Sequence, residues 1–202
     1  MRRFSGGRLV VATHNRGKMD EMRALFAPVG VALVSAGELG LPEPEETETS
    51  FVGNARLKAH AAARATGEVT LADDSGLEVD ALDGQPGVFT ANWAEVEGGR
   101  DFGHAMRRTH GALLERGAEE PWRARFRCTL VLAWPDGQDE VFEGVAEGRL
   151  VWPIRGREGH GYDPMFQPNG SELTFAEMTD AQKNAVSHRA RAFAAMLFAC
   201  FT

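Results

Sequence analysis

Apolar residues fall in short runs along the chain, and the spacing within these runs predicts strands that alternate with helices. Compact apolar runs predict strands at residues 9–12, 68–72, 77–82, 126–134 and 140–146. Apolar residues three and four positions apart predict helices at residues 19–26, 102–114 and 189–201, together with an alanine-rich helix that ends near Gly67. This order predicts an α/β fold with a mixed central sheet flanked by helices.

A polar loop at residues 13–18 follows the first predicted strand and leads into the first predicted helix. Backbone N–H groups at the start of a helix favour anions, and Lys18 adds a positive charge. The loop lacks the G-x-x-x-x-G-K-[ST] pattern of a Walker A loop. It is a candidate phosphate-binding loop, and the alternative is that Thr13 or Asn15 simply caps the helix.

An acidic, proline-containing stretch at residues 41–48 is expected to be a long loop that runs into the alanine-rich helix. Ser50 is the expected N-cap of that helix. Asn54 and Lys58 are four residues apart and share a face, which could present an amide and an ammonium to a ligand beside the acidic loop. The alternative is a solvated helix whose charges have no binding role.

Two adjacent carboxylates, Asp73 and Asp74, precede Ser75 and Gly76. Neighbouring carboxylates repel each other, so one of them is expected to be held by a cation or to have a raised pKa. The pair can then support a metal ion, act as a general base, or do both. The alternative is a solvated turn, since Asp, Ser and Gly are common turn residues.

A late cluster combines residues 159–164 with Lys183 and with residues 187–189, which precede the last predicted helix. Glycines on both sides of His160 would let its ring approach a flat ligand closely. If Ser187 caps the helix, His188 and Arg189 lie in its first turn, where cations oppose the helix dipole. Such a local conflict is more frequent at functional positions than at structural ones. The alternative for any single histidine is a place in the core or on the surface.

The composition excludes some classes of function. The chain has 202 residues, enough for one domain with a substantial core, and its formal net charge of −7 argues against a general nucleic-acid-binding surface. An anionic substrate would then need a local basic cleft. Cys128 and Cys200 lie in apolar segments and are expected to be buried thiols, and no zinc site is indicated. The apolar run at residues 9–12 is too short for a signal peptide or a membrane span, so a cytoplasmic protein is expected.

Taken together, these segments resemble the Ham1/RdgB-type inosine triphosphate pyrophosphatases, a family that removes non-canonical purine nucleotides from nucleotide pools. Five motifs occur in the family's order and span nearly the whole chain. They are Thr13-x-Asn15-x-x-Lys18-x-x-Glu21, Glu46 through Lys58, residues 72–77 with Pro86-Gly87-Val88, Gly161-Tyr162-Asp163-Pro164, and Lys183 with Ser187-His188-Arg189.

The resemblance implies a single pyrophosphatase domain over residues 1–202, with two lobes around a long nucleotide-binding cleft, and a homodimer. It implies Mg²⁺ as the cofactor, with Glu46, Asp73 and Asp74 as the metal-associated acids. Glu45 and Glu48 are so close to Glu46 in sequence that any of the three could be the acid of this loop nearest the metal. Asp74 would also accept a proton, and Lys18 and Lys58 would act on the phosphates. The implied substrate-binding residues are Thr13, His14, Asn15, Arg16, Gly17, Lys18, Ser75, His160, Gly161, Tyr162, Asp163, Lys183, His188 and Arg189.

The implied reaction is attack of water on the α-phosphorus of ITP, dITP or XTP, which releases the monophosphate and pyrophosphate. Lys18, Lys58 and Lys183 would stabilise the phosphate charge. A 6-oxo purine has an acceptor where adenine has a donor, so donors from Arg189, His188 or nearby backbone would accept hypoxanthine and xanthine and oppose adenine.

Three positions depart from the family pattern. Glu48 stands where the family usually has glycine, His160 stands where it usually has phenylalanine, and Asn92 stands where it more often has arginine. The imidazole of His160 is smaller and more polar than a phenyl ring, which bears on base preference. Two alternatives follow: a nucleotide pyrophosphatase of different base preference, such as the Maf-like enzymes that act on modified pyrimidines, or a nucleotide-binding module without catalysis.

Overall fold

A mixed six-stranded sheet in the order β2-β1-β3-β6-β7-β8 organises the chain, and a computed structural model describes residues 1–201. β1 pairs in parallel with both β2 and β3, and β7 pairs antiparallel with β8. The register sets Val11 opposite Leu71 and Leu150 opposite Phe166. The strands are β1 (Arg8–Val11), β2 (Ala32–Ser35), β3 (Thr70–Val79), β6 (Trp122–Ala133), β7 (Asp139–Leu150) and β8 (Phe166–Pro168). The predicted α/β class with a mixed sheet flanked by helices is confirmed.

The chain forms two compact units, each made of segments that are distant in sequence. Unit 1 contains Met1–Asp74, Cys128–Gly144 and the C-terminal segment from Ala190, and unit 2 contains Ser75–Arg127 and Val145–Arg189. β3, β6 and β7 therefore contribute residues to both units. The implied single domain and its cleft stay predictions.

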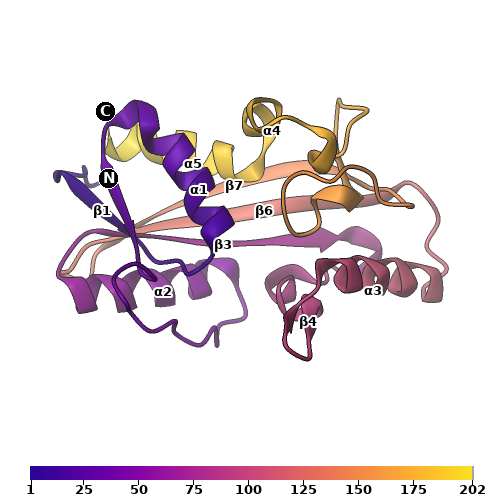
Figure 1. Cartoon of the computed structure of the whole chain (residues 1–202), viewed down its shortest axis with the longest axis horizontal. Coiled ribbons are helices and arrows are strands. Elements are labelled where there is room, and N and C mark those ends of the chain that lie inside the picture. Colours follow the sequence, from indigo (N-terminus) through magenta and orange to yellow (C-terminus); the bar gives the residue numbers. More distant parts are fainter. Residues whose placement is uncertain (202) are drawn as a thin grey trace. The chain divides into compact units, whose positions relative to one another are not determined.

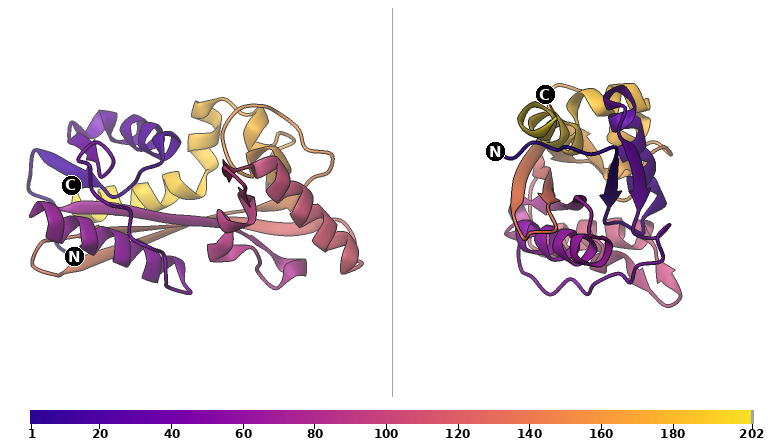
Figure 2. Two further views of the ribbon diagram at one scale, coloured as in Figure 1. Left: turned by 60° about the horizontal axis from the view of Figure 1, so that its bottom comes forward. Right: turned by 90° about the vertical axis from the view of Figure 1, so that its left-hand side faces the viewer.

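In unit 1, helices cover both faces of the strands: α2 (Phe51–Thr66) lies on one face, and α1 (Arg16–Phe26) and α5 (His188–Cys200) lie on the other (Figures 1 and 2). Helices pack on both faces because the buried residues of a strand such as β1 alternate between the two faces. Leu9 and Val11 join the cluster that includes α1 and α5, whereas Val10 joins the alanines of α2. Small alanine side chains let this helix pack close to the strands.

The helix ends of unit 1 follow from local chemistry. The Asn15 side chain accepts a hydrogen bond from the Lys18 N–H at the start of α1, and the Ser50 side chain accepts one from the Gly53 N–H at the start of α2. α2 ends at Gly67, whose φ of 70° lies in the left-handed region that favours glycine. The predicted Ser50 cap is confirmed.

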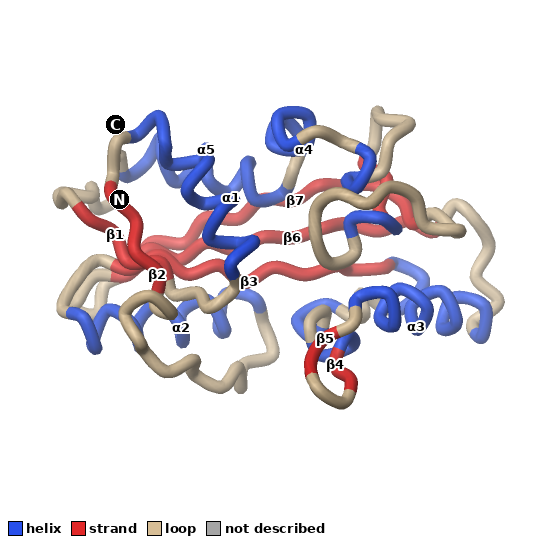
Figure 3. Tube along the Cα trace, in the orientation of Figure 1, coloured by secondary structure: helices blue, strands red, loops and turns tan. Residues whose placement is uncertain are grey.

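In unit 2, the helices are α3 (Phe102–Glu115) and α4 (Asp180–Val186), with a short hairpin of β4 (Glu95–Val96) and β5 (Gly99–Arg100) (Figure 3). Its core contains Leu77, Leu113, Phe126, Phe166 and Phe175. Short 3-10 turns occur at Ala27–Val29 in unit 1 and, in unit 2, at Asp80–Leu82, Gly87–Phe89, Asn92–Ala94, Asp163–Met165 and Phe175–Glu177.

The largest local difference from the sequence prediction concerns residues 68–82. The apolar runs predict two strands, at residues 68–72 and 77–82, with a polar segment between them. The structure instead has one continuous strand, β3, that contains Asp73 and Asp74. Both aspartates are buried, so the solvated-turn alternative is wrong. The strands β2 and β8 were not predicted, and residues 41–48 form a loop as expected. None of the helices described within residues 1–201 is both long enough and apolar enough to span a membrane.

Candidate active site

Five charged side chains of unit 1 gather around β3 and form what we call the acid–lysine cluster: Lys18, Glu46, Lys58, Asp73 and Asp74. Lys18 Nζ lies 2.5 Å from Asp73 Oδ1. Lys58 Nζ lies 2.8 Å from Glu46 Oε1 and 3.0 Å from Asp74 Oδ1. The structure therefore brings together the three implied metal-associated acids and the two lysines of this unit that are implied to act on the phosphates.

The alternation of β3 explains how two adjacent carboxylates are accommodated. Successive side chains of a strand point to opposite faces. Leu71 packs in the cluster beside α1, and Asp73, two residues on, meets Lys18 of α1. Ala72 packs beside α2, and Asp74 meets Lys58 of α2. Each carboxylate is thus paired with its own lysine, and their mutual repulsion is reduced.

Asp74 has the properties of a proton acceptor. Only 5% of it is exposed, and burial raises the pKa of its carboxyl against the opposing attraction of Lys58 and Lys18. Its Oδ2 atom is buried and has no hydrogen-bond partner among the described residues. Burial also acts to lower the pKa of Lys58, but the charges of Asp74 and Glu46 outweigh it and the pKa is raised. Lys58 therefore stays charged beside Asp74.

The acidic loop is tied to the start of α2. The buried Asn54 side chain accepts a hydrogen bond from the Glu48 N–H at 3.0 Å. A Cβ atom at Gly53 would lie 2.7 Å from Glu48 Cβ, so the loop packs directly against the helix at this glycine. Of the three candidate acids, Glu46 is the one that contacts Lys58, while Glu45 and Glu48 line a groove of about 890 Å³ along α2 with Arg56, His60 and Arg64. The Asn54 side chain, which was predicted to face a ligand, is thus used to hold the backbone of the acidic loop.

The polar loop before α1 is organised by its own side chains. Thr13 Oγ1 accepts a hydrogen bond from the Asn15 N–H, and Asn15 Oδ1 accepts one from the Lys18 N–H, both at 3.1 Å. The His14 ring lies 2.8 Å from the Leu41 carbonyl oxygen. Asn15 is therefore the helix cap, as the alternative interpretation held. Arg16 is exposed and Gly17 half-buried, so backbone at the start of α1 faces solvent, where an anion is favoured.

In unit 2, Asp163 is held from several directions. Its Oδ2 atom accepts hydrogen bonds from Lys183 Nζ at 2.7 Å and from the His160 N–H at 2.8 Å. Gly159 has a φ of 73°, and a Cβ there would lie 2.2 Å from the same oxygen, so only glycine fits. The pair of Asp163 and Lys183 is buried, while the His160 residue is exposed.

Tyr162 is placed differently from a ligand-contacting side chain. It is 1% exposed, belongs to the hydrophobic core of unit 2, and packs edge-on against Phe102 at 5.9 Å. Burial raises the pKa of its hydroxyl to about 12, so the side chain is neutral. The motif that contains Tyr162 thus combines a core residue with the half-buried Gly161 and the exposed His160. The role of Tyr162 in substrate binding stays a prediction.

His188 and Arg189 lie at the start of α5 and are both buried. The His188 ring stacks on Phe126 at 4.9 Å with an interplanar angle of 13°, and it lies 6.4 Å from Phe175. Arg189 Nη2 donates a hydrogen bond to Ser75 Oγ at 3.3 Å. Two predicted substrate-binding residues, 114 positions apart, are therefore neighbours in unit 2.

One contact of the cluster was missed from the sequence. The Cys128 thiol of β6 donates a hydrogen bond to Asp73 Oδ2 at 3.1 Å. The sequence predicted that Cys128 is a buried thiol, which is confirmed, as it is for Cys200. No sequence signal indicated its neighbour, because the contact depends on which strands lie side by side.

The residues fit a magnesium ion by their donor chemistry. Within residues 1–201, no three His, Cys, Asp or Glu side chains form a ready-made metal group. Mg²⁺ commonly uses one or two carboxylates together with substrate phosphate oxygens and waters, so such a group is not required. Glu46 and Asp74 already flank a positive charge, and the Asp74 Oδ2 atom has no partner among the described residues.

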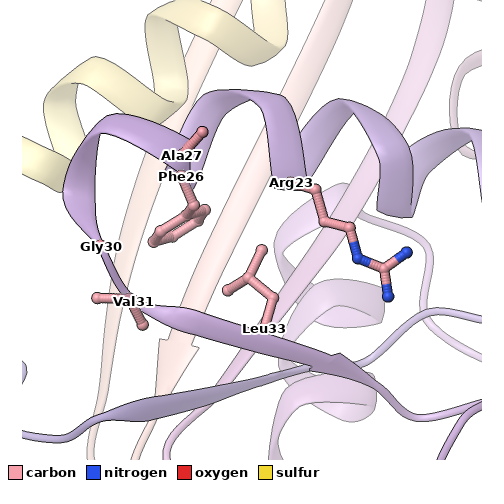
Figure 4. A pocket seen from close by; sticks show the side chains of 6 residues that line it. All are labelled: Arg23, Phe26, Ala27, Gly30, Val31 and Leu33. Carbon is pink, nitrogen blue, oxygen red and sulfur yellow. The ribbon is translucent and has the colours of Figure 1, made fainter.

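A second, smaller hollow in unit 1 lies away from these residues. It is a pocket of about 260 Å³ near the end of α1. Figure 4 shows Phe26, Val31 and Leu33 around it, with Arg23 nearby. Arg23 pairs with Glu38 at 2.6 Å. The pocket contains none of the predicted site residues.

Comparisons with known proteins agree with the motifs. The Ham1 family model matches residues 9–199. A dITP/XTP pyrophosphatase of Ruegeria pomeroyi is 63% identical over 200 residues, covering 99% of this chain and 98% of its own. A dITP/XTP pyrophosphatase of Rhodospirillum centenum is 54% identical over 200 residues with the same coverage of both chains.

Solved structures give the same result. A HAM1 protein from Coxiella burnetii superposes with a TM-score of 0.85 at 34% identity, covering 94% of this chain and 95% of that one. A nucleoside-triphosphatase / dITP/XTP pyrophosphatase from Mycobacterium abscessus has a TM-score of 0.73 at 39% identity, covering 94% and 98%. These relatives are nucleoside triphosphate pyrophosphatases by name, which is the enzyme class predicted from the sequence. By its family model, its relatives and its fold, the chain belongs to the Ham1 family.

Proposed function

We propose that this protein hydrolyses the non-canonical purine nucleoside triphosphates dITP, XTP and ITP to the monophosphate and pyrophosphate. The names of its relatives support this substrate class. The observation that carries the chemistry is the buried Asp74 carboxylate, one oxygen of which is anchored to Lys58 while the other has no partner among the described residues.

Asp74 takes the proton from the attacking water in this proposal. A general base works best when its pKa lies nearer the working pH than that of a solvated aspartate, and burial shifts Asp74 in that direction. Lys58 fixes Asp74 Oδ1, so Oδ2 is the atom left to receive the proton.

The lysines bind and stabilise the phosphates. Lys18 and Lys58 contribute two ammonium groups to the acid–lysine cluster, and charge on the leaving pyrophosphate grows as its bond to the α-phosphorus breaks. Lys183 is assigned to the same task in unit 2. The polar loop of Thr13, His14, Asn15, Arg16 and Gly17 is assigned to the phosphates in this proposal, because the start of α1 favours negative charge.

Glu46, Asp73 and Asp74 would hold Mg²⁺. The ion would supply neutralisation of phosphate charge and polarisation of the oxygens that it binds. Among the acids of the loop, Glu46 is favoured because Lys58 links it to Asp74.

The purine base is assigned to residues of unit 2. Arg189 is a permanent donor and contacts Ser75, and His188 is held rigidly by its stack on Phe126. Rigid donors suit the 6-oxo acceptor of hypoxanthine and xanthine and leave the amino group of adenine unmatched. His160, Gly161, Tyr162 and Asp163 complete this group, with the exposed His160 in the place of the family's usual aromatic ring.

The cellular setting is part of the same proposal. A cytoplasmic homodimer that removes deaminated purine nucleotides would keep them out of DNA and RNA.

The test is product analysis by ³¹P NMR with Mg²⁺ and dITP, XTP, ITP, dUTP, GTP and ATP in separate reactions. We expect monophosphate and pyrophosphate from dITP, XTP and ITP, with ATP and GTP largely unchanged. Diphosphate and orthophosphate would contradict the α-phosphorus reaction. Turnover confined to pyrimidine nucleotides would favour the different base preference, and binding without turnover would favour the non-catalytic module.

A further inference from the structure

Asp73 is held at both of its oxygens, and the two donors come from different elements of unit 1. Lys18 Nζ of α1 binds Oδ1 at 2.5 Å, and the Cys128 thiol of β6 binds Oδ2 at 3.1 Å. Donors on both oxygens prevent the carboxylate from rotating about its Cβ–Cγ bond. Asp74, one residue on, has a donor on Oδ1 and none among the described residues on Oδ2.

The thiol suits this place for two physical reasons. Cys128 is fully buried and packs with Leu71 and Leu130, and cysteine is accommodated among apolar side chains as a small hydrophobic residue. Its S–H is also a weak, neutral donor. It therefore orients the Asp73 carboxylate without cancelling its charge, whereas a second lysine would cancel it.

We propose that Cys128 is a positioning residue that fixes the orientation of the Asp73 carboxylate and, through it, of the Lys18 ammonium. The proposal rests on the proposed function, because it takes Asp73 and Lys18 as groups that bind the magnesium complex of a polyphosphate. Loss of the thiol would let the carboxylate turn, and Lys18 would follow its oxygen.

Cys200 offers a matched control. Both cysteines are buried in the same hydrophobic cluster of unit 1, and neither forms a disulfide. Cys200 lies near the end of α5 and is not assigned to the site. Cys200→Ala therefore removes one sulfur atom from the same core, as Cys128→Ala does, and reports the general effect of the lost packing.

The experiment compares wild-type protein with Cys128→Ala, Cys128→Ser and Cys200→Ala. Isothermal titration calorimetry measures the affinity for inorganic tripolyphosphate with Mg²⁺, thermal unfolding measures stability, and dITP hydrolysis gives the Mg²⁺ requirement. We expect Cys128→Ala to weaken tripolyphosphate binding and raise the Mg²⁺ requirement by about tenfold. This is the smaller of the losses that typically follow when a residue that orients a metal ligand is substituted. Cys128→Ser should stay within about threefold of wild type, because its hydroxyl can still donate a hydrogen bond to Asp73. Cys200→Ala should lose stability but keep wild-type binding.

Three results would overturn the inference. Cys128→Ala could match Cys200→Ala in tripolyphosphate affinity, Cys128→Ser could be as impaired as Cys128→Ala, or the wild-type protein could fail to bind magnesium tripolyphosphate. Failure of the proposed function looks different: binding would respond to Cys128→Ala as expected, while wild-type protein would not hydrolyse dITP or XTP.

Discussion

Units 1 and 2 both bury charged side chains, but they hold them in different ways. In unit 1, the acid–lysine cluster is held mainly by opposite charges, with Lys58 between Glu46 and Asp74. In unit 2, buried polar groups also depend on close packing: His188 stacks on Phe126, and the Asp163 carboxylate, although paired with Lys183, fits tightly against Gly159. The difference indicates that substitutions in unit 1 alter chemistry first, whereas substitutions in unit 2 alter stability first.

The largest expected effect is on turnover in unit 1. Asp74→Asn keeps the shape of the side chain but removes the proton acceptor, so kcat should fall by about 10²- to 10⁴-fold. Stability should change little, because Lys58 keeps its ion pair with Glu46. Steady-state kinetics and thermal unfolding measure the two effects, with the exposed Asp20→Asn as control. A kcat within threefold of wild type would exclude Asp74 as the base.

The next effect is on stability in unit 2. Lys183→Met leaves the Asp163 carboxylate buried without its counter-charge, a change that typically costs about 3–5 kcal/mol. Lys18→Met in unit 1 is the matched variant and should cost less, because Lys18 is more exposed and Asp73 keeps the Cys128 hydrogen bond. Urea unfolding measures both. Equal losses would remove the proposed distinction between the units.

A variant at His188 separates packing from recognition within unit 2. His188→Phe keeps an aromatic ring against Phe126 but removes the ring nitrogens. We expect the melting temperature to change little and KM for XTP and dITP to rise by about tenfold, equivalent to one lost hydrogen bond of about 1.4 kcal/mol. His188→Ala should lose both properties. Unchanged KM values in His188→Phe would assign His188 to packing alone.

The smallest effect concerns Asp139 of β7 in unit 1. Burial alone would raise the pKa of Asp139, but hydrogen bonds from Arg56 and His60 outweigh it and hold that pKa below its usual value. The carboxylate therefore stabilises the fold above the unfolded pKa of about 3.9, and this contribution is lost as the pH falls through the lower folded pKa.

Asp139→Asn should accordingly lower the melting temperature at pH 7 by about 2–4 °C, for a loss of about 1 kcal/mol. The difference from wild type should shrink as the pH falls below about 4, because the carboxyl of the unfolded wild-type chain begins to bind a proton there, and it should vanish below the folded pKa. Calorimetry across pH 3–8 tests this. A constant difference over that range would show that the Asp139 charge contributes nothing.

Several features of the site could be predicted from neighbouring residues alone. The Ser50 cap and the shared face of Asn54 and Lys58 were expected, because helix ends and faces depend on residues within about four positions. The hydrogen-bond partner of Asn54 was not expected, because its side chain accepts from the Glu48 backbone N–H and was predicted to face a ligand. Tyr162 lay in a recognisable motif, yet its burial in the core could not be seen from that motif.

The sequence by itself determined the family, the α/β class, the longer helices, and the residue types that can carry the chemistry. Periodicity and short motifs express these properties, since they depend on local spacing. Only the tertiary structure decided that Asp73 and Asp74 lie within one strand and meet different lysines, that Glu46 is the acid beside Lys58, and that Cys128 contacts Asp73. The physical reason is that these contacts join residues 12 to 55 positions apart, and only strand pairing and helix packing bring such residues together.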